Sequence, residues 1–177
     1  MSEIQISWPW QYNFPPFFSL QPHRETRNKQ IAAWRNLILE YFKLTKQSTL
    51  DIHEATNLPV FNNTQINRKL DSNTLLTILG ELQNTGNAAP IDKQKNMWEI
   101  YWHTLDEWAS IVYNYISGIG ATNSVMTIYE LTQGDDIQTE EFCGLDVNVF
   151  IKILKVLESQ GKCEVMVIDD QQGVKFF

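Results

Sequence analysis

The sequence contains few cysteines and none of the motifs that build catalytic or metal sites. Cys143 and Cys163 form neither a CxxC pair nor part of the larger even set that marks a disulfide framework. His23, His53 and His103 are isolated, and HExxH, GxSxG and phosphate-binding glycine loops are all missing. We therefore expect reduced thiols, no metal, no other cofactor and no enzymatic activity.

The chain also lacks the apolar segments that membranes require. No apolar run approaches the roughly 18 residues that indicate a membrane-spanning helix. The N-terminal residues MSEIQISWPWQ have neither a basic segment nor an apolar run before a small-residue cleavage site, which argues against a secretory signal. We expect a soluble, cytoplasmic protein that reaches a membrane only through its partners.

What the sequence does contain is one segment that occurs twice. Residues 70–87, LDSNTLLTILGELQNTGN, are matched 75 positions later by residues 145–162, LDVNVFIKILKVLESQGK. In each copy an Asp is placed to cap the first free amides of a helix, and a Gly is placed to end it. These pairs are Asp71 with Gly86 and Asp146 with Gly161. Apolar residues recur between them with a period near 3.6, so each helix is predicted to bury one face.

Three flanking segments repeat in the same order and at nearly the same spacing. They pair residues 32–43 with 106–117, residues 48–55 with 124–131, and residues 98–102 with 173–177. A period this long indicates two small domains side by side in the sequence, because solenoid repeats are shorter. We predict an arm over residues 1–22, a first domain over residues 23–102 and a second over residues 103–177.

Each unit is predicted to be a winged helix. The first has an amphipathic helix over residues 26–44, a short extended stretch, weak helical segments over residues 53–58 and 62–70, the repeated helix and a hairpin. The second unit's hairpin is predicted over residues 163–168 and 174–177, across the turn DDQQG. This order is that of a helix-turn-helix with a β wing. The fold class is therefore mainly α with small β wings (α+β), as two tandem winged-helix domains.

Positive charge is scarce where nucleic-acid recognition requires it. The chain has 14 Lys and Arg against 21 Asp and Glu, a formal net charge of −7. The first candidate recognition helix, residues 72–85, has no Lys or Arg, and the second has only Lys152 and Lys155. Affinity for DNA depends on neutralising phosphates. We therefore expect no nucleic-acid binding, and a winged-helix DNA-binding transcription regulator is only the alternative function.

The arm is rich in proline and aromatic residues. Residues 7–22, SWPWQYNFPPFFSLQP, hold four of the six prolines and six aromatic residues. Proline fixes φ and biases the preceding residue toward extended backbone, which predicts an extended, polyproline-like arm. Its rings need a surface to cover them. Either the arm folds back on the first domain near Trp34, or it docks on another protein as a set of aromatic anchors.

Several of these segments together resemble the family of small subunits of the ESCRT-II complex. The resemblance is carried by WPWQYNFPPFFSLQP, TRNKQIAAW, FNN, RKL, NSVMTIYEL and the terminal GVKFF, and it covers nearly the whole chain. It implies two winged-helix domains that make protein contacts without catalysis. In that family two copies of the small subunit dock on two larger subunits in a Y-shaped assembly on endosomes, which sorts ubiquitinated cargo into multivesicular bodies.

The resemblance also implies which residues bind partners. The family anchors its small subunit through a Pro-Pro-x-aromatic motif, and Phe18 stands where that motif is written with Tyr, so apolar packing replaces any phenol hydrogen bond. The predicted contacts to the sister subunits are Trp8, Trp10, Pro15, Pro16, Phe17 and Phe18. The second domain of the family receives the N-terminal helix of an ESCRT-III subunit, for which we predict Met126 and Thr127. Met suits adaptable interfaces, but Met126 as a core residue is the open alternative.

Overall fold

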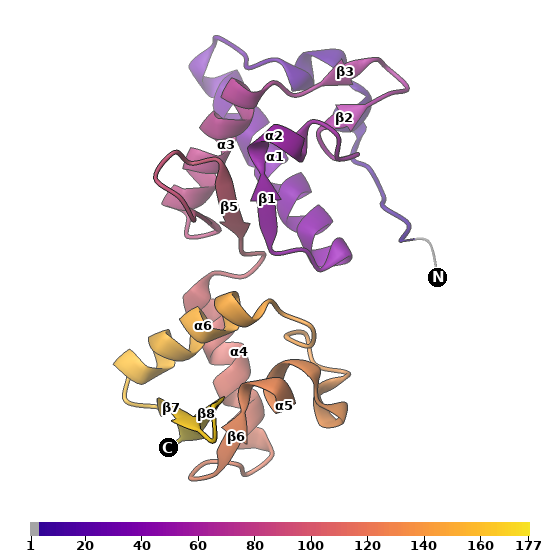
Figure 1. The fold of residues 1–177 in the computed structure, drawn as a ribbon. Coiled ribbons are helices and arrows are strands. Elements are labelled where there is room, and N and C mark those ends of the chain that lie inside the picture. Colours follow the sequence, from indigo (N-terminus) through magenta and orange to yellow (C-terminus); the bar gives the residue numbers. More distant parts are fainter. Residues whose placement is uncertain (1–3) are drawn as a thin grey trace. The chain divides into compact units, whose positions relative to one another are not determined.

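The computed structural model describes residues 4–177, and the chain divides into unit 1, Met1–Trp102, and unit 2, His103–Phe177 (Figure 1). The first three residues of the predicted arm lie outside the described residues. Both units contain helices and a small antiparallel sheet, in the order helix, strand, helix, helix, hairpin. The predicted α+β winged-helix class is confirmed. Every helix among the described residues is too short or too polar to cross a membrane.

Unit 1 is built on α1 and α3 with a three-stranded sheet in the order β1-β5-β4. Its elements are the 3-10 helices η1 (Trp10–Asn13) and η2 (Pro15–Phe18), α1 (Arg24–Thr45), β1 (Thr49–Asp51), α2 (Ile52–Ala55), β2 (Asn62–Asn63), β3 (Arg68–Lys69), α3 (Ser72–Asn84), β4 (Ala88–Pro90) and β5 (Met97–Ile100). The core gathers Trp34, Ile38 and Phe42 of α1 and Ile78 and Leu79 of α3. The fold thus rests on the two apolar helix faces that the sequence predicts.

Unit 2 repeats this plan with a sheet in the order β6-β8-β7. Its elements are α4 (Leu105–Gly118), β6 (Val125–Thr127), α5 (Ile128–Gln133), the 3-10 helix η3 (Asp135–Ile137), α6 (Val147–Ser159), β7 (Cys163–Ile168) and β8 (Gln171–Phe176). The first α-helices of the two units differ in length, since α1 has 22 residues and α4 has 14. Thr104 and Glu107 form a capping box at the start of α4.

The caps predicted for the repeated helices are confirmed. The Asp71 carboxylate accepts from the Thr74 N–H at 2.7 Å, and Asp146 accepts from the N–H groups of Asn148 and Val149. Gly86 and Gly161 follow the helices with φ of 79° and 72°. Glycine suits these positions because it has no Cβ to oppose the left-handed conformation.

The wing of unit 2 is longer and its turn tighter than predicted. β8 begins at Gln171, so Asp169 and Asp170 alone form the loop, and Val165 pairs with Val174. Both Asp residues have positive φ, 49° and 62°. Two left-handed residues in succession characterise the type I′ turn, whose twist matches that of antiparallel strands. The prediction of a five-residue turn is therefore wrong.

Residues 62–70 were predicted to be helical and instead form the β2–β3 hairpin. Asn62 pairs with Lys69 and Asn63 with Arg68. Asn67 adopts φ of 53° in the turn between the strands, a conformation that Asn tolerates better than most residues. The weak apolar periodicity of this segment is overridden by local turn chemistry.

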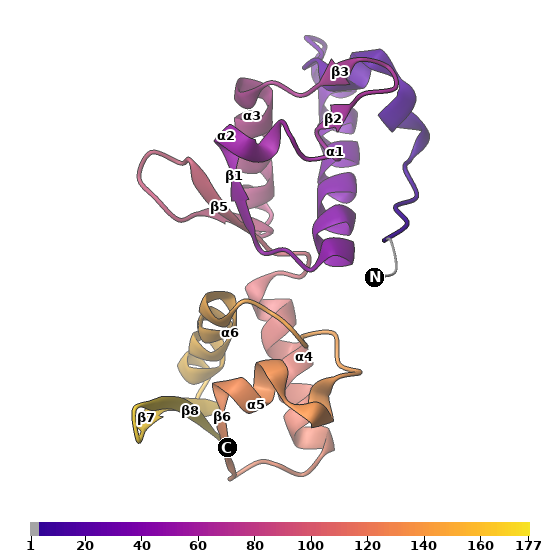
Figure 2. The same ribbon diagram turned by 45° about the vertical axis from the view of Figure 1, so that its right-hand side comes forward.

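The arm is folded rather than extended, so that part of the prediction is also wrong. Pro15 and Pro16 occupy the first turn of η2, where a fixed φ near −65° fits a helix start and the missing N–H is not needed. Figure 2 shows the coiled part of the arm lying beside the N-terminal part of α1 and the β2–β3 hairpin, with the preceding residues running along α1 toward its C-terminal end, all within unit 1. The arm is therefore an integral part of unit 1.

Candidate functional site

The arm buries half of its aromatic rings in unit 1. Tyr12, Phe17 and Phe18 are buried. The Phe17 ring stacks on Trp34 with centroids 4.3 Å apart, and Phe18 meets the same indole edge-on at 5.4 Å. Both geometries are favourable for aromatic pairs. Phe17 and Phe18, predicted as partner contacts, therefore pack within their own chain.

Tyr12 fastens the arm to the β2–β3 side of unit 1. Its hydroxyl donates to the Pro59 carbonyl at 2.6 Å, and the Asn63 side-chain amide donates to the Tyr12 carbonyl at 2.6 Å. Burial, and secondarily the Tyr41 hydroxyl, raises the pKa of Tyr12 above its ordinary value. The phenol is therefore kept neutral and able to donate. Trp8 is half-buried and stacks on Tyr12 with centroids 4.1 Å apart.

The other side of the arm presents exposed apolar groups. Trp10 is 70% exposed and Phe14 is 48% exposed, and their ring centroids lie 5.8 Å apart. Pro15 and Pro16 are exposed beside them. Phe14 was not among the predicted partner contacts. Its backbone is extended, with φ of −103° and ψ of 107°, as that of residues before proline usually is.

These exposed groups border a cavity of about 480 Å³ between the arm and α1. We call it the arm groove. It is lined by Trp10, Gln11, Phe14, Pro16, Phe17, Gln21, Thr26, Lys29, Gln30 and Ala33. Its size and largely apolar lining, with a few polar groups, suit capture of a ring or a branched side chain from another protein. The arm thus combines a buried side that fixes it with an exposed side that is available for contact.

A second hollow, which we call the wing groove, lies in unit 2. It has a volume of about 890 Å³ and is lined by Thr127, Ile128, Tyr129, Glu130, Thr132, Gln133, Val147, Asp170, Gln171 and Gln172. Tyr129 is 70% exposed. The lining includes the carboxylates of Glu130 and Asp170 and no basic side chain. The apolar side chains of Ile128, Tyr129 and Val147 beside these carboxylates favour a positively charged amphipathic segment.

The two residues predicted for the second domain have different surroundings. Thr127 lines the wing groove and also caps α5, since its hydroxyl accepts from the Glu130 N–H at 3.1 Å. Met126 is half-buried in β6, opposite Val174, and is not among the groove residues. Tyr129, which is exposed and lines the groove, was not among the predicted residues.

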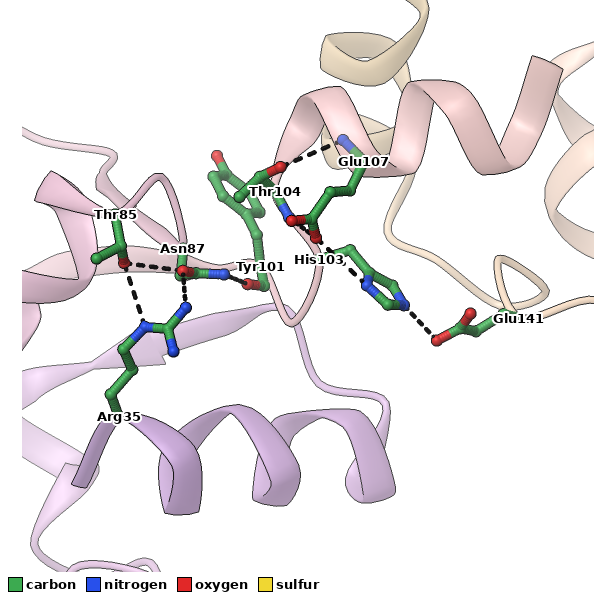
Figure 3. Close-up of polar contacts among 8 residues, drawn as sticks. All are labelled: Arg35, Thr85, Asn87, Tyr101, His103, Thr104, Glu107 and Glu141. Carbon is green, nitrogen blue, oxygen red and sulfur yellow. Dashed lines mark hydrogen bonds and ion pairs between the residues drawn. The ribbon is translucent and has the colours of Figure 1, made fainter. Parts of the chain in front are cut away.

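Near its C-terminal end, unit 1 holds a buried polar network (Figure 3). Arg35 donates to the Asn87 side-chain oxygen at 2.9 Å, and the Asn87 amide donates to the Tyr101 carbonyl at 2.9 Å. The Tyr101 hydroxyl donates to Glu99 at 3.0 Å. Burial, together with the charge of Glu99 and this hydrogen bond, raises the pKa of Tyr101. These contacts hold the end of β5 in place.

His103, at the start of unit 2, is surrounded by two carboxylates and an aromatic ring. Its Nε2 lies 2.5 Å from Glu141, and its Nδ1 lies 3.5 Å from Glu107 (Figure 3). The ring packs edge-on against Trp108 with centroids 4.8 Å apart. Among residues 4–177, no group of three His, Cys, Asp or Glu side chains is arranged to hold a metal ion.

The two cysteines are not joined by a disulfide. Cys163 is buried and donates from Sγ to the Leu154 carbonyl at 3.2 Å. Burial, and secondarily the Glu158 carboxylate, raises the pKa of Cys163 to about 11. The thiol therefore stays protonated and unreactive near neutral pH, since the thiolate is the reactive species.

Comparisons with known proteins agree with this architecture. The family model for ESCRT-II complex subunits matches residues 11–146. The chain is 46% identical over 174 residues to vacuolar protein-sorting-associated protein 25 of Danio rerio, covering 98% of this chain and 100% of that protein. It is similar to the crystal structure of subunit VPS25 of the endosomal trafficking complex ESCRT-II, with a TM-score of 0.82, 26% identity and coverage of 96% and 99%.

A further solved structure is that of the endosomal complex ESCRT-II, VPS22/VPS25/VPS36. This chain is 27% identical to its matching chain, with a TM-score of 0.80 and coverage of 95% and 98%. The resemblance seen in the sequence is thereby confirmed. The chain belongs to the family of ESCRT-II complex subunits.

Proposed function

We propose that this chain is a non-catalytic scaffold of an ESCRT-II complex, present in two copies. It docks on two larger subunits through the arm and unit 1, and it recruits an ESCRT-III subunit through unit 2. It thereby acts in sorting ubiquitinated cargo into multivesicular bodies. The protein is cytoplasmic and reaches the endosomal membrane through its partners. The similarity to a chain of the VPS22/VPS25/VPS36 complex supports this proposal.

The observation that carries the docking role is the exposed pair Trp10 and Phe14 on a fixed arm. Large aromatic anchors dominate the energy of protein interfaces. Phe17 and Phe18 are held in the core of unit 1. The neighbouring residues 10–16 are therefore already ordered and lose little conformational entropy on binding. Pro15 and Pro16 then serve as exposed contacts, whereas Phe17 and Phe18 act by positioning the segment.

Replacing Trp10 and Phe14 by alanine is expected to weaken binding to the two larger subunits. Each anchor contributes about 2 kcal/mol or more if it is a hot spot, so each loss lowers affinity at least about tenfold. Titration calorimetry with the co-purified larger subunits measures this. Ile91→Ala is the control, because Ile91 is another exposed apolar residue of unit 1, away from the arm groove. Equal affinity of the double variant and the parent would contradict the docking role.

The wing groove is our proposed site for the ESCRT-III subunit. Residues 103–177 carry 12 Asp and Glu against 4 Lys and Arg, so a basic amphipathic helix approaches a surface of opposite charge. Tyr129 and Val147 offer exposed apolar area beside Glu130 and Asp170. Charge of opposite sign raises the association rate, and the apolar contacts supply affinity.

Tyr129→Ala is expected to weaken binding of the N-terminal helix of the ESCRT-III subunit about tenfold or more, because an exposed aromatic anchor is lost. Fluorescence anisotropy of a labelled helix peptide measures the change. Val167→Ala is the matched control, since Val167 is equally exposed on the wing but does not line the groove. Thr127 is unsuitable for this test because its hydroxyl caps α5. Equal affinity of the peptide for both variants would show that it does not bind at the wing groove.

A further inference from the structure

Building on the proposed docking role of the arm, we propose that Gln30 of α1 positions the arm for its partners, together with the buried rings of Tyr12, Phe17 and Phe18. Gln30 is a polar side chain that is only 8% exposed. Its side-chain amide donates to the Phe17 carbonyl at 2.9 Å and to the Ser19 carbonyl at 2.8 Å. Its side-chain oxygen accepts from the Gln21 N–H at 3.0 Å. Each of these hydrogen bonds goes to the backbone of the arm.

The arm needs such a partner because its own backbone is short of donors. Pro15, Pro16 and Pro22 have no N–H. Buried carbonyls that find no donor carry a cost comparable to a lost hydrogen bond. Gln30 supplies donors from a neighbouring helix. The Trp34 indole N–H adds a second donor to the Phe17 carbonyl at 2.8 Å, and the Gln21 side-chain amide adds one to the Ser19 carbonyl at 2.8 Å.

The segment that Gln30 holds is continuous with the exposed anchors. The Phe17 N–H donates to the Phe14 carbonyl at 3.0 Å, and Gln30 lines the same arm groove as Trp10 and Phe14. Release of residues 16–21 would therefore leave the anchors held from one side only, through Tyr12. The apparent affinity for a partner falls in proportion to the fraction of molecules in the competent conformation.

The first test replaces Gln30 by methionine, which keeps the length of the side chain and removes its hydrogen bonds. The Trp34 indole N–H resonance reports closure of the arm without any partner. We expect this resonance to shift toward that of a solvent-exposed indole, while the resonances of α3 stay unchanged. Binding to the co-purified larger subunits should weaken about tenfold, as one lost positioning contact of this strength implies.

Gln83→Met is the matched control, since the same change is made at an exposed position of α3. It should leave both the indole resonance and the affinity unchanged. A loss of affinity in this control equal to that of Gln30→Met would show that the substitution type, and not the arm contact, is responsible.

A second variant, Gln30→Glu, separates positioning from a general loss of stability. Its carboxylate faces the Phe17 and Ser19 carbonyls, which repel it, and burial among acceptors raises the pKa of a carboxyl group. Below that pKa the neutral carboxyl donates one hydrogen bond to the arm. Arm closure in Gln30→Glu should therefore recover as the pH is lowered, whereas Gln30→Met should show no such recovery.

Two results would overturn the inference. One is an unchanged Trp34 indole resonance in Gln30→Met, because the arm would then be held without Gln30. The other is a released arm with unaltered affinity for the larger subunits, because closure would then be irrelevant to docking. Failure of the docking role itself has a different signature: the Trp10 and Phe14 variants bind normally, while the indole resonance still responds to Gln30.

Discussion

Leu154→Ala is expected to lower the free energy of unfolding of unit 2 by about 2–5 kcal/mol, the usual cost of truncating a fully buried leucine. Leu154 has no exposed surface, and it lies on the face of α6 that also carries Phe150 and Ile153. A domain of this size is stable by only about 0.05–0.15 kcal/mol per residue. The substitution therefore removes a large part of the stability of unit 2.

Urea denaturation followed by circular dichroism measures this effect. Lys155→Ala is the control, because the adjacent Lys155 side chain is exposed on the same helix and alanine is the better helix former, so the helix itself is not weakened. An unfolding midpoint for Leu154→Ala that matches the control would mean that this position does not contribute to the core.

Phe17→Ala is expected to destabilise unit 1 by about 3–5 kcal/mol, since a buried phenylalanine leaves a large cavity. The ring stacks on Trp34 at an interplanar angle of 2°, so the Trp34 indole also loses a contact surface. Loss of partner binding in this variant would follow from disorder of the arm. Its effect is thus distinct from that of Trp10→Ala, which removes an exposed contact.

Phe14→Ala provides the matched control for stability. The residue type and the segment are the same, but Phe14 is 48% exposed, and exposed substitutions usually change stability by about 0.5 kcal/mol or less. Thermal denaturation monitored by tryptophan fluorescence compares the two. Equal melting temperatures for both variants would show that the Phe17 ring does not support unit 1.

The repeated helices could be predicted because their signals are local. An Asp at the start, a Gly at the end and an apolar stripe between them lie within one segment, and the same set recurs 75 positions later. The structure places Asp71 and Asp146 as caps and Gly86 and Gly161 in the left-handed conformation. Local chemistry of this kind does not depend on the rest of the fold.

The roles of the six aromatic residues in the arm could not be predicted individually. Their burial depends on groups far along the chain, such as Pro59 and Asn63 for Tyr12 and Trp34 for Phe17. Composition alone does not distinguish Phe14, which is exposed, from Phe17, which is buried. The two alternatives for the arm, folding back and presenting rings to a partner, thus apply to different side chains of one segment.

The difference in length between α1 and α4 makes the duplicated modules non-interchangeable. Aligning Trp34 with Trp108 places Gln30 opposite Thr104, the N-cap of α4, so the first turns of α1 have no counterpart in unit 2. There the equivalent indole is covered by His103 instead of an arm ring. A chimera with the module order reversed would leave the arm without a receptor, because only unit 1 has the extended first helix on which the arm packs.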